Sequence, residues 1–84
     1  MAKFDSDMAL QCLASLVMIS NSKAHSEMAK ETARLAASDY TLLLYGIHNN
    51  NYSKHIEDRF VGILKEINQC PKTFIEALGV DYTE

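Results

Sequence analysis

Cysteine and glycine are scarce in this sequence, with two cysteines and three glycines in 84 residues. Cys12 and Cys70 lack the C-x-x-C spacing of a zinc or redox site. Gly46, Gly62 and Gly79 are too far apart to form a glycine-rich phosphate loop. Two isolated cysteines also provide no disulfide framework, so we expect the protein in a reducing compartment, the cytoplasm.

Clustered positive charge is missing as well. Eight lysines and arginines are spread among eleven acidic residues, and the net charge is -3. Because contacts to nucleic-acid phosphates need grouped Lys and Arg side chains, we do not expect nucleic-acid binding.

The chain has no apolar run long enough to span a membrane. Residues 8–22 are uncharged, but polar residues interrupt this window, which falls short of the roughly 20 apolar residues that a span requires. Asp5 and Asp7 stand where a secretion signal would carry positive charge. We therefore expect a soluble protein without a membrane partner that retains its first helix.

Motifs for metal binding and covalent catalysis are also missing. Di-iron bundles use Glu-x-x-His pairs, and none of His25, His48 and His55 has an acidic residue three positions earlier. Cys12 lies in the apolar window, where burial makes a thiol inert, and Cys70 has no identifiable base. We predict no metal, no cofactor and no enzymatic activity.

The uncharged window 8–22 is the most informative feature of the sequence. At helical spacing its polar positions form one narrow stripe, and apolar side chains cover the rest of the helix. Such a helix is buried from more than one side, and a chain of this length has few elements with which to cover it. We therefore predict a homo-oligomer, a dimer in the first instance, with Leu10, Leu13, Leu16 and Val17 at its interface.

Helix signals divide the chain into four segments. The first helix is expected from a cap at Asp5 or Ser6 to about residue 20, and the second from about 23, after a cap at Ser22, to about 45, with Gly46 ending it. The third starts at Ser53 and carries apolar residues at 56, 60, 63, 64 and 67. Pro71 interrupts it, and a capping box at 73–76 opens a short fourth helix.

No strand pattern or linker is apparent, so residues 1–84 are predicted to form a single helical domain. The fold class is all-α: a small bundle of three helices plus a short C-terminal fourth, completed by oligomerisation.

Two groups of residues are candidates for binding. Tyrosine is enriched at binding surfaces that are both apolar and able to form hydrogen bonds. Two tyrosines bracket an asparagine-rich loop, which is therefore a candidate binding region. The alternative is that this loop is an ordinary connection between helices. Gly62 leaves a notch on the outer face of the third helix. The partner-binding candidates are Tyr45, His48, Asn50, Tyr52, His55, Asp58, Arg59 and Gly62.

Lys30 and Arg34 lie one helical turn apart and are candidates for binding an anion. Glu27 and Glu31 occupy the same helix at ion-pair spacing, so a solvated surface of paired charges is the alternative.

The composition favours a small non-catalytic protein–protein interaction module that binds a partner protein and blocks or bridges it. Immunity proteins, antitoxins, adaptors and phage-encoded inhibitors act in this way. The comparison with them is based on composition alone. One alternative is an oligomeric protein that binds or sequesters a nucleotide or another anion. A second is a helix-turn-helix DNA-binding regulator that uses the third and fourth helices.

Overall fold

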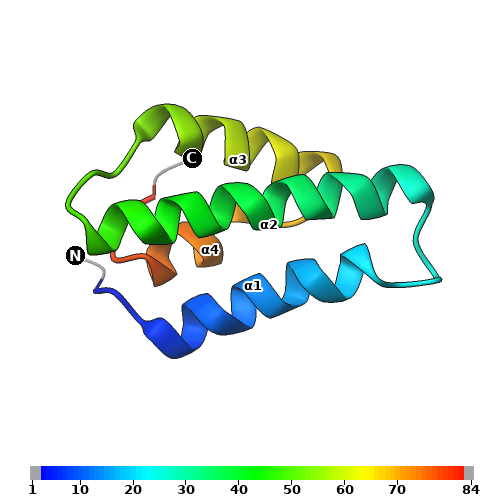
Figure 1. The fold of residues 1–84 in the computed structure, drawn as a ribbon, viewed down its shortest axis with the longest axis horizontal. Coiled ribbons are helices and arrows are strands. Elements are labelled where there is room, and N and C mark those ends of the chain that lie inside the picture. The colour runs from blue at the N-terminus through cyan, green and yellow to red at the C-terminus, as the bar shows by residue number, and fades with distance from the viewer. Residues whose placement is uncertain (1–2, 83–84) are drawn as a thin grey trace.

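A computed structural model of the protein describes residues 3–82 (Figure 1). This range contains four helices and no strand: α1 (Ser6–Ser20), α2 (Glu27–His48), α3 (Lys54–Glu66) and α4 (Pro71–Ala77). α2 packs against both α1 and α3, while the short α4 lies behind α2 and packs against α1 and α3. The predicted all-α bundle of three helices and a short fourth is confirmed.

An aromatic cluster of Tyr40, Phe60 and Phe74 forms the centre of the bundle, with one ring each from α2, α3 and α4. The centroid of the Tyr40 ring lies 5.2 Å from that of Phe60 and 5.7 Å from that of Phe74. The Tyr40 hydroxyl donates a hydrogen bond of 2.8 Å to the Phe74 carbonyl oxygen, so its polar atom is satisfied. Fully buried aliphatic side chains surround the cluster: Leu16, Leu43, Leu64, Ile75 and Leu78.

Side-chain caps start three of the helices. Asp5 accepts a hydrogen bond from the Met8 backbone N–H at 3.0 Å, which confirms the predicted start of α1. Ser53 accepts one from the Ile56 N–H at 3.2 Å and confirms the start of α3. These oxygens satisfy backbone donors that have no partner within the helix.

The start of α2 differs from the prediction. Ser26, and not Ser22, is its N-cap and accepts a hydrogen bond from the Ala29 N–H at 3.1 Å. The Ser22 side chain instead accepts from the Ala24 N–H at 3.1 Å, within the connection. Two serines four residues apart both have cap chemistry, and local sequence does not choose between them.

The end of α2 is also a correction, because Gly46 lies inside the helix and not after it. A Cβ at Gly46 would stand 2.7 Å from the Asn51 carbonyl oxygen. The glycine is therefore needed for the close approach of the following loop. The helix ends at His48, and Asn50 takes the left-handed conformation with φ 53°. The Asn51 N–H donates to the Gly46 carbonyl oxygen at 2.8 Å, as in a Schellman motif.

The predicted capping box at 73–76 is wrong, because α4 starts at Pro71, three residues before the start that an N-cap at Thr73 would give. Proline suits the first position of a helix, where its missing N–H costs nothing. Cys70 is the N-cap and makes no side-chain cap hydrogen bond. Gly79 follows α4 with φ 83°, in agreement with its predicted place after the helix.

The end of α4 and the residues after it contact Phe4 and Asp5. The Asp5 N–H donates to the Ala77 carbonyl oxygen at 2.9 Å, and Phe4 pairs with Leu78 in an isolated bridge. A Cβ at Gly79 would lie 2.7 Å from the Phe4 backbone nitrogen. Gly79 thus combines a left-handed backbone with a tight contact between the two ends of the fold.

Alanine substitutions at two glycines should act in opposite directions. Gly79→Ala should lower the free energy of unfolding by about 1–3 kcal/mol, because L residues are strained at this φ and the new Cβ meets backbone. Gly62→Ala should raise it by up to about 1 kcal/mol, since its Cβ has nothing within 4 Å and alanine favours a helix. Urea unfolding midpoints measure both effects, and equal midpoints for the two variants would contradict the backbone roles given to these glycines.

Candidate functional site

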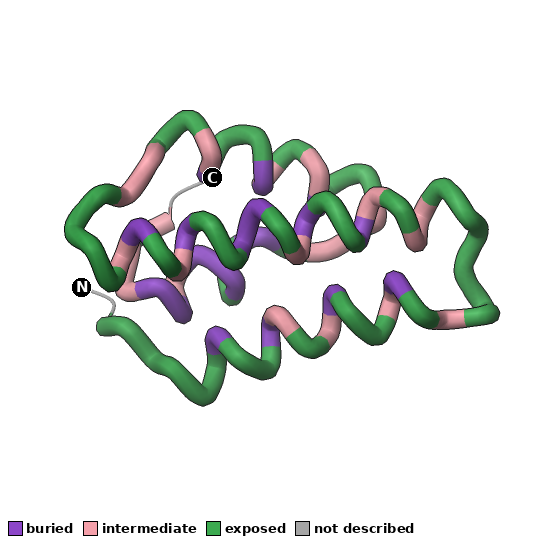
Figure 2. Tube along the Cα trace, viewed as in Figure 1, coloured by how far each residue is buried: buried purple, intermediate pink, exposed green. Residues whose placement is uncertain are grey.

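Exposed positions recur along the whole length of α2 (Figure 2), and several of them carry large apolar side chains. Met28, Leu35 and Leu42 follow one another at intervals of seven residues, and Met28 is 80% exposed. Tyr45 lies one turn beyond Leu42 and is 69% exposed. We call Met28, Leu35, Leu42 and Tyr45 the outer stripe of α2.

The inward face of the same helix uses a different set of positions. Ala33, Ala36, Tyr40 and Leu43 are buried in the core. Sequence reasoning missed the outer stripe as a surface. The signal that could have revealed this surface is the seven-residue spacing of Met28, Leu35 and Leu42 on the side of the helix opposite the buried alanines.

α1 divides its apolar side chains between the core and the surface. Leu10 is 62% exposed, and Val17 and Met18 are exposed too. Leu13 is partly buried against the core. Leu16 is a correction: it is wholly buried inside the chain's own fold, so it cannot contact a second copy from that position.

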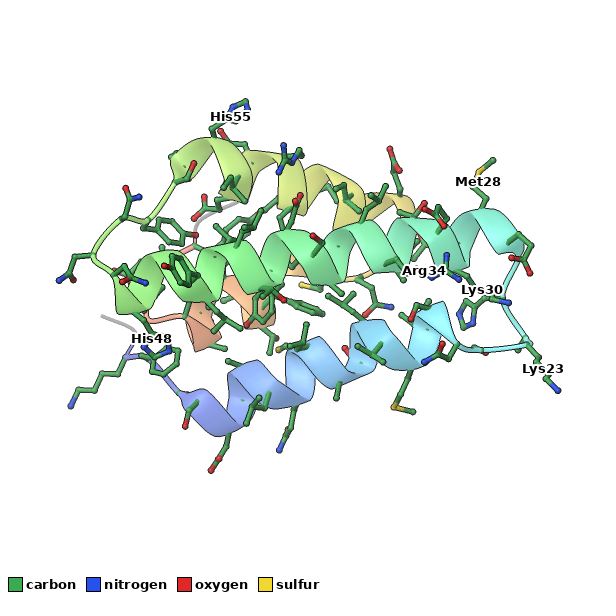
Figure 3. All side chains as sticks on the ribbon, viewed as in Figure 1. Lys23, Met28, Lys30, Arg34, His48 and His55 are labelled. Carbon is green, nitrogen blue, oxygen red and sulfur yellow. The ribbon has the colours of Figure 1, made fainter. Side chains whose placement is uncertain are left out.

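The predicted binding region around the asparagine-rich loop does not form a single site. His48 points toward the start of the chain, where its ring packs edge to face against Phe4 at 5.3 Å. His55 stands on the opposite side, on the outer face of α3 (Figure 3). Asn50 adopts the positive φ that the turn after α2 requires. The two histidines therefore do not converge on one ligand.

Tyr52 is held by a buried acid. Its hydroxyl donates a hydrogen bond of 2.6 Å to Glu57, whose side chain also pairs with Lys54. Burial, followed by the hydrogen bond to Glu57, raises the pKa of the Tyr52 hydroxyl above its usual range. This cluster fixes the loop to the first turn of α3. Sequence reasoning missed Glu57 as a buried residue because charged side chains are rarely buried.

Arg59 is also engaged within the chain. Its guanidinium donates two hydrogen bonds, of 3.0 and 2.9 Å, to the buried carboxylate of Asp39 on α2. The hydrogen bonds to Asp39 raise the pKa of Arg59. A bidentate pair of this kind orients α2 against α3. Asp58, next to Arg59, is exposed, and one of its carboxylate oxygens lies 3.9 Å from the Lys54 ammonium.

Both candidate anion-binding residues have acidic neighbours on their own helix. The Lys30 ammonium lies 3.1 Å from a Glu27 carboxylate oxygen. Arg34 pairs with Glu31 in the same way. An anion would have to compete with these carboxylates, as the alternative interpretation of a paired surface implies.

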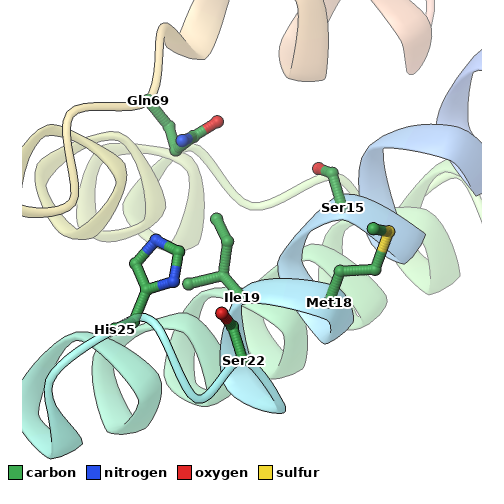
Figure 4. A pocket seen from close by; sticks show the side chains of 6 residues that line it. All are labelled: Ser15, Met18, Ile19, Ser22, His25 and Gln69. Carbon is green, nitrogen blue, oxygen red and sulfur yellow. The ribbon is translucent and has the colours of Figure 1, made fainter.

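An open groove of about 310 Å³ lies beside the C-terminal half of α1 (Figure 4). Side chains from α1, from the α1–α2 connection and from the segment before α4 line it. Its apolar wall comes from α1 and its polar atoms from hydroxyl, imidazole and amide groups. The lining residues are Ser15, Met18, Ile19, Ser22, His25 and Gln69.

The two cysteines have different surroundings. Cys12 is buried, and burial raises the pKa of its thiol, as the sequence predicted. Cys70 is exposed at the N-cap of α4. Within residues 3–82, no three His, Cys, Asp or Glu side chains come together in a way that could hold a metal ion.

α4 offers little surface for DNA recognition. Of its seven residues, Pro71, Phe74, Ile75 and Ala77 are buried. A recognition helix presents several side chains to a groove, so the observed packing gives no support to the helix-turn-helix alternative.

No protein-family model, curated protein or solved structure matches this chain. None of the helices in the described part of the chain combines the length and the hydrophobicity that a membrane span requires.

The buried tyrosines make stability sensitive to alkaline pH. The pKa values of Tyr40 and Tyr52 are both raised, so the native state retains these protons after the unfolded chain, with a tyrosine pKa near 10, has lost them. Their contribution to stability is complete below about pH 10 and decreases as the pH rises above it.

The Tm should therefore fall between pH 9 and pH 11.5 and should fall less steeply for Tyr52→Phe. Tyr45→Phe, which changes an exposed ring, is the matched control. Thermal unfolding across this pH range measures the slopes. Identical slopes for the wild type and Tyr52→Phe would contradict the role given to the Tyr52 proton.

Proposed function

We propose that this chain is a small non-catalytic protein-interaction module, active in the cytoplasm, that binds a partner protein and blocks or bridges it. The observation that carries the proposal is the exposure of large apolar side chains on the outward faces of both long antiparallel helices. Leu10, Val17 and Met18 stand on α1, and the outer stripe stands on α2. Apolar side chains grouped on a surface are typical of sites for protein association.

The polar groups of the chain support the same function. Arg59, Tyr52 and Lys30 each bind an acidic group of the chain itself. Arg59 therefore holds α3 to α2, Tyr52 holds the loop to α3, and Lys30 is paired within its own helix. Recognition then depends on apolar contact and on the shape of the helix faces.

Capture of the tagged protein from its native cells tests the proposal. The wild type should retain a defined partner, and Met18→Glu should lose it, because the carboxylate would be desolvated in an apolar contact. Gln11→Glu adds the same charge at an exposed polar position of the same helix and should retain the partner.

Recovery of the same proteins with all three chains, or of none, would contradict the proposed module. A thermal-shift screen of the wild type tests the rival ligand-binding function. A ligand bound by the folded state alone raises the Tm. A rise with millimolar nucleotide that Lys30→Gln abolishes would favour that function instead.

A further inference from the structure

Two methionines are the most exposed large apolar side chains in the described part of the chain. Met28, in the first turn of α2, is 80% exposed, and Met18, near the end of α1, is 72% exposed. Both thioethers therefore lie outside the buried core, on the apolar faces to which the proposed function assigns partner binding.

Open grooves border both thioethers, so a small solute can reach them. Met18 forms part of the wall of the groove of about 310 Å³ beside α1 (Figure 4). Met28 points outward from α2 (Figure 3). It borders a second groove, of about 410 Å³, together with Thr32 of α2 and Ile67 after α3.

Met8 provides an internal comparison for these two side chains. It lies in the first turn of α1 and is 38% exposed. Thr73 and Glu76 of α4 line the same surface hollow as Met8. An oxidant must touch the sulfur to react, so the rate of oxidation follows exposure. The fold therefore ranks Met18 and Met28 ahead of Met8.

The reaction that these thioethers undergo is a two-electron transfer of oxygen from a hydroperoxide, ROOH. A sulfur lone pair attacks one peroxide oxygen, so an S–O bond forms and the O–O bond breaks. The leaving alkoxide takes up the hydroperoxide proton and becomes ROH. The sulfur is oxidised and the peroxide is reduced. Sulfoxide reductases reverse the change: two thiols become a disulfide, and the sulfoxide oxygen leaves as water.

Oxidation makes the exposed faces more polar and leaves the core unchanged. The sulfoxide oxygen accepts hydrogen bonds, and its burial against an apolar partner without a donor costs free energy. The other apolar side chains of the two faces contain no sulfur. They are Leu10, Val17, Leu35, Leu42 and Tyr45.

We propose that Met18 and Met28 are sites of reversible oxidation, and that their conversion to sulfoxides by a hydroperoxide prevents apolar binding by the module. The effect on binding rests on the proposed function, whereas the oxidation depends only on the exposure of the two sulfur atoms. Reduction of the sulfoxides restores both apolar faces.

Fragmentation mass spectrometry of the full chain during treatment with hydrogen peroxide tests the sites. The chain carries Cys70→Ser, because the exposed Cys70 thiol would also react. In the folded protein Met28 should be oxidised about twofold faster than Met8, in proportion to their exposed fractions of 80% and 38%. Met18 should react at nearly the rate of Met28, and the helical circular dichroism should be retained.

The same chain unfolded in urea is the control, since its methionines should react at equal rates. Equal rates for Met8, Met18 and Met28 in the folded protein would overturn the assignment of the sites. Protection of Met18 and Met28 relative to the unfolded chain would overturn it as well.

Partner capture tests the effect on binding. The oxidised protein should retain about tenfold less partner than the untreated protein, and sulfoxide reductases with dithiothreitol should restore capture. Met18→Leu with Met28→Leu keeps both faces apolar without sulfur, so this variant should retain its partner after the same treatment. Undiminished capture by the oxidised protein, or an equal loss by the leucine variant, would overturn the proposed regulation.

Retention on a phenyl column distinguishes failure of this inference from failure of the proposed function, because it needs no partner. Peroxide should shorten the retention of the Cys70→Ser chain and leave that of the leucine variant in the same background unchanged. If the untreated protein captures no partner, the proposed function is contradicted, and a shortened retention still supports the two oxidation sites. Unchanged retention after treatment would overturn them.

Discussion

The Tyr40 hydroxyl donates a hydrogen bond to the Phe74 carbonyl oxygen, and the Tyr40 ring packs against Phe60 and Phe74. These contacts join α2, α3 and α4 at one point. Residues 40 and 74 are far apart in sequence, so their contact closes a long loop. The free energy of the contact must offset the entropy lost in that closure. Aromatic contact supplies much of this free energy, and the hydrogen bond satisfies the one polar atom that would oppose burial. The remaining helix, α1, packs against α2 and α4, two of the helices joined here.

Two polar interactions complete the packing of α3 and determine which side chains remain free to bind a partner. Asp39 holds Arg59 between α2 and α3, and Glu57 holds Tyr52 at the start of α3. These interactions involve Tyr52 and Arg59, which the sequence had suggested as parts of a recognition surface. The outward apolar side chains of α1 and α2 have no comparable role inside the chain, and for this reason the proposed interactions are assigned to them.

The predicted and observed candidate sites differ because exposure is a tertiary property. Helical spacing showed that α1 is apolar on nearly every side, and it could not show that Leu16 lies inside while Leu10 lies outside. The neighbours that cover Leu16 come from distant parts of the chain. Tyr52, Arg59 and Gly62 were grouped by sequence proximity, whereas the fold buries part of Tyr52, neutralises Arg59 and leaves Gly62 open.

The number and type of helices followed from the sequence alone, because apolar periodicity and the caps at Asp5 and Ser53 act within a few residues. The start of α2, the place of Gly46 inside it, the buried acids and the outer stripe were decided by the tertiary structure. Each of these depends on which segment lies opposite: Asn51 faces Gly46, and Arg59 faces Asp39. Local backbone preferences contain no information about such neighbours, because only the packing of the helices brings them together.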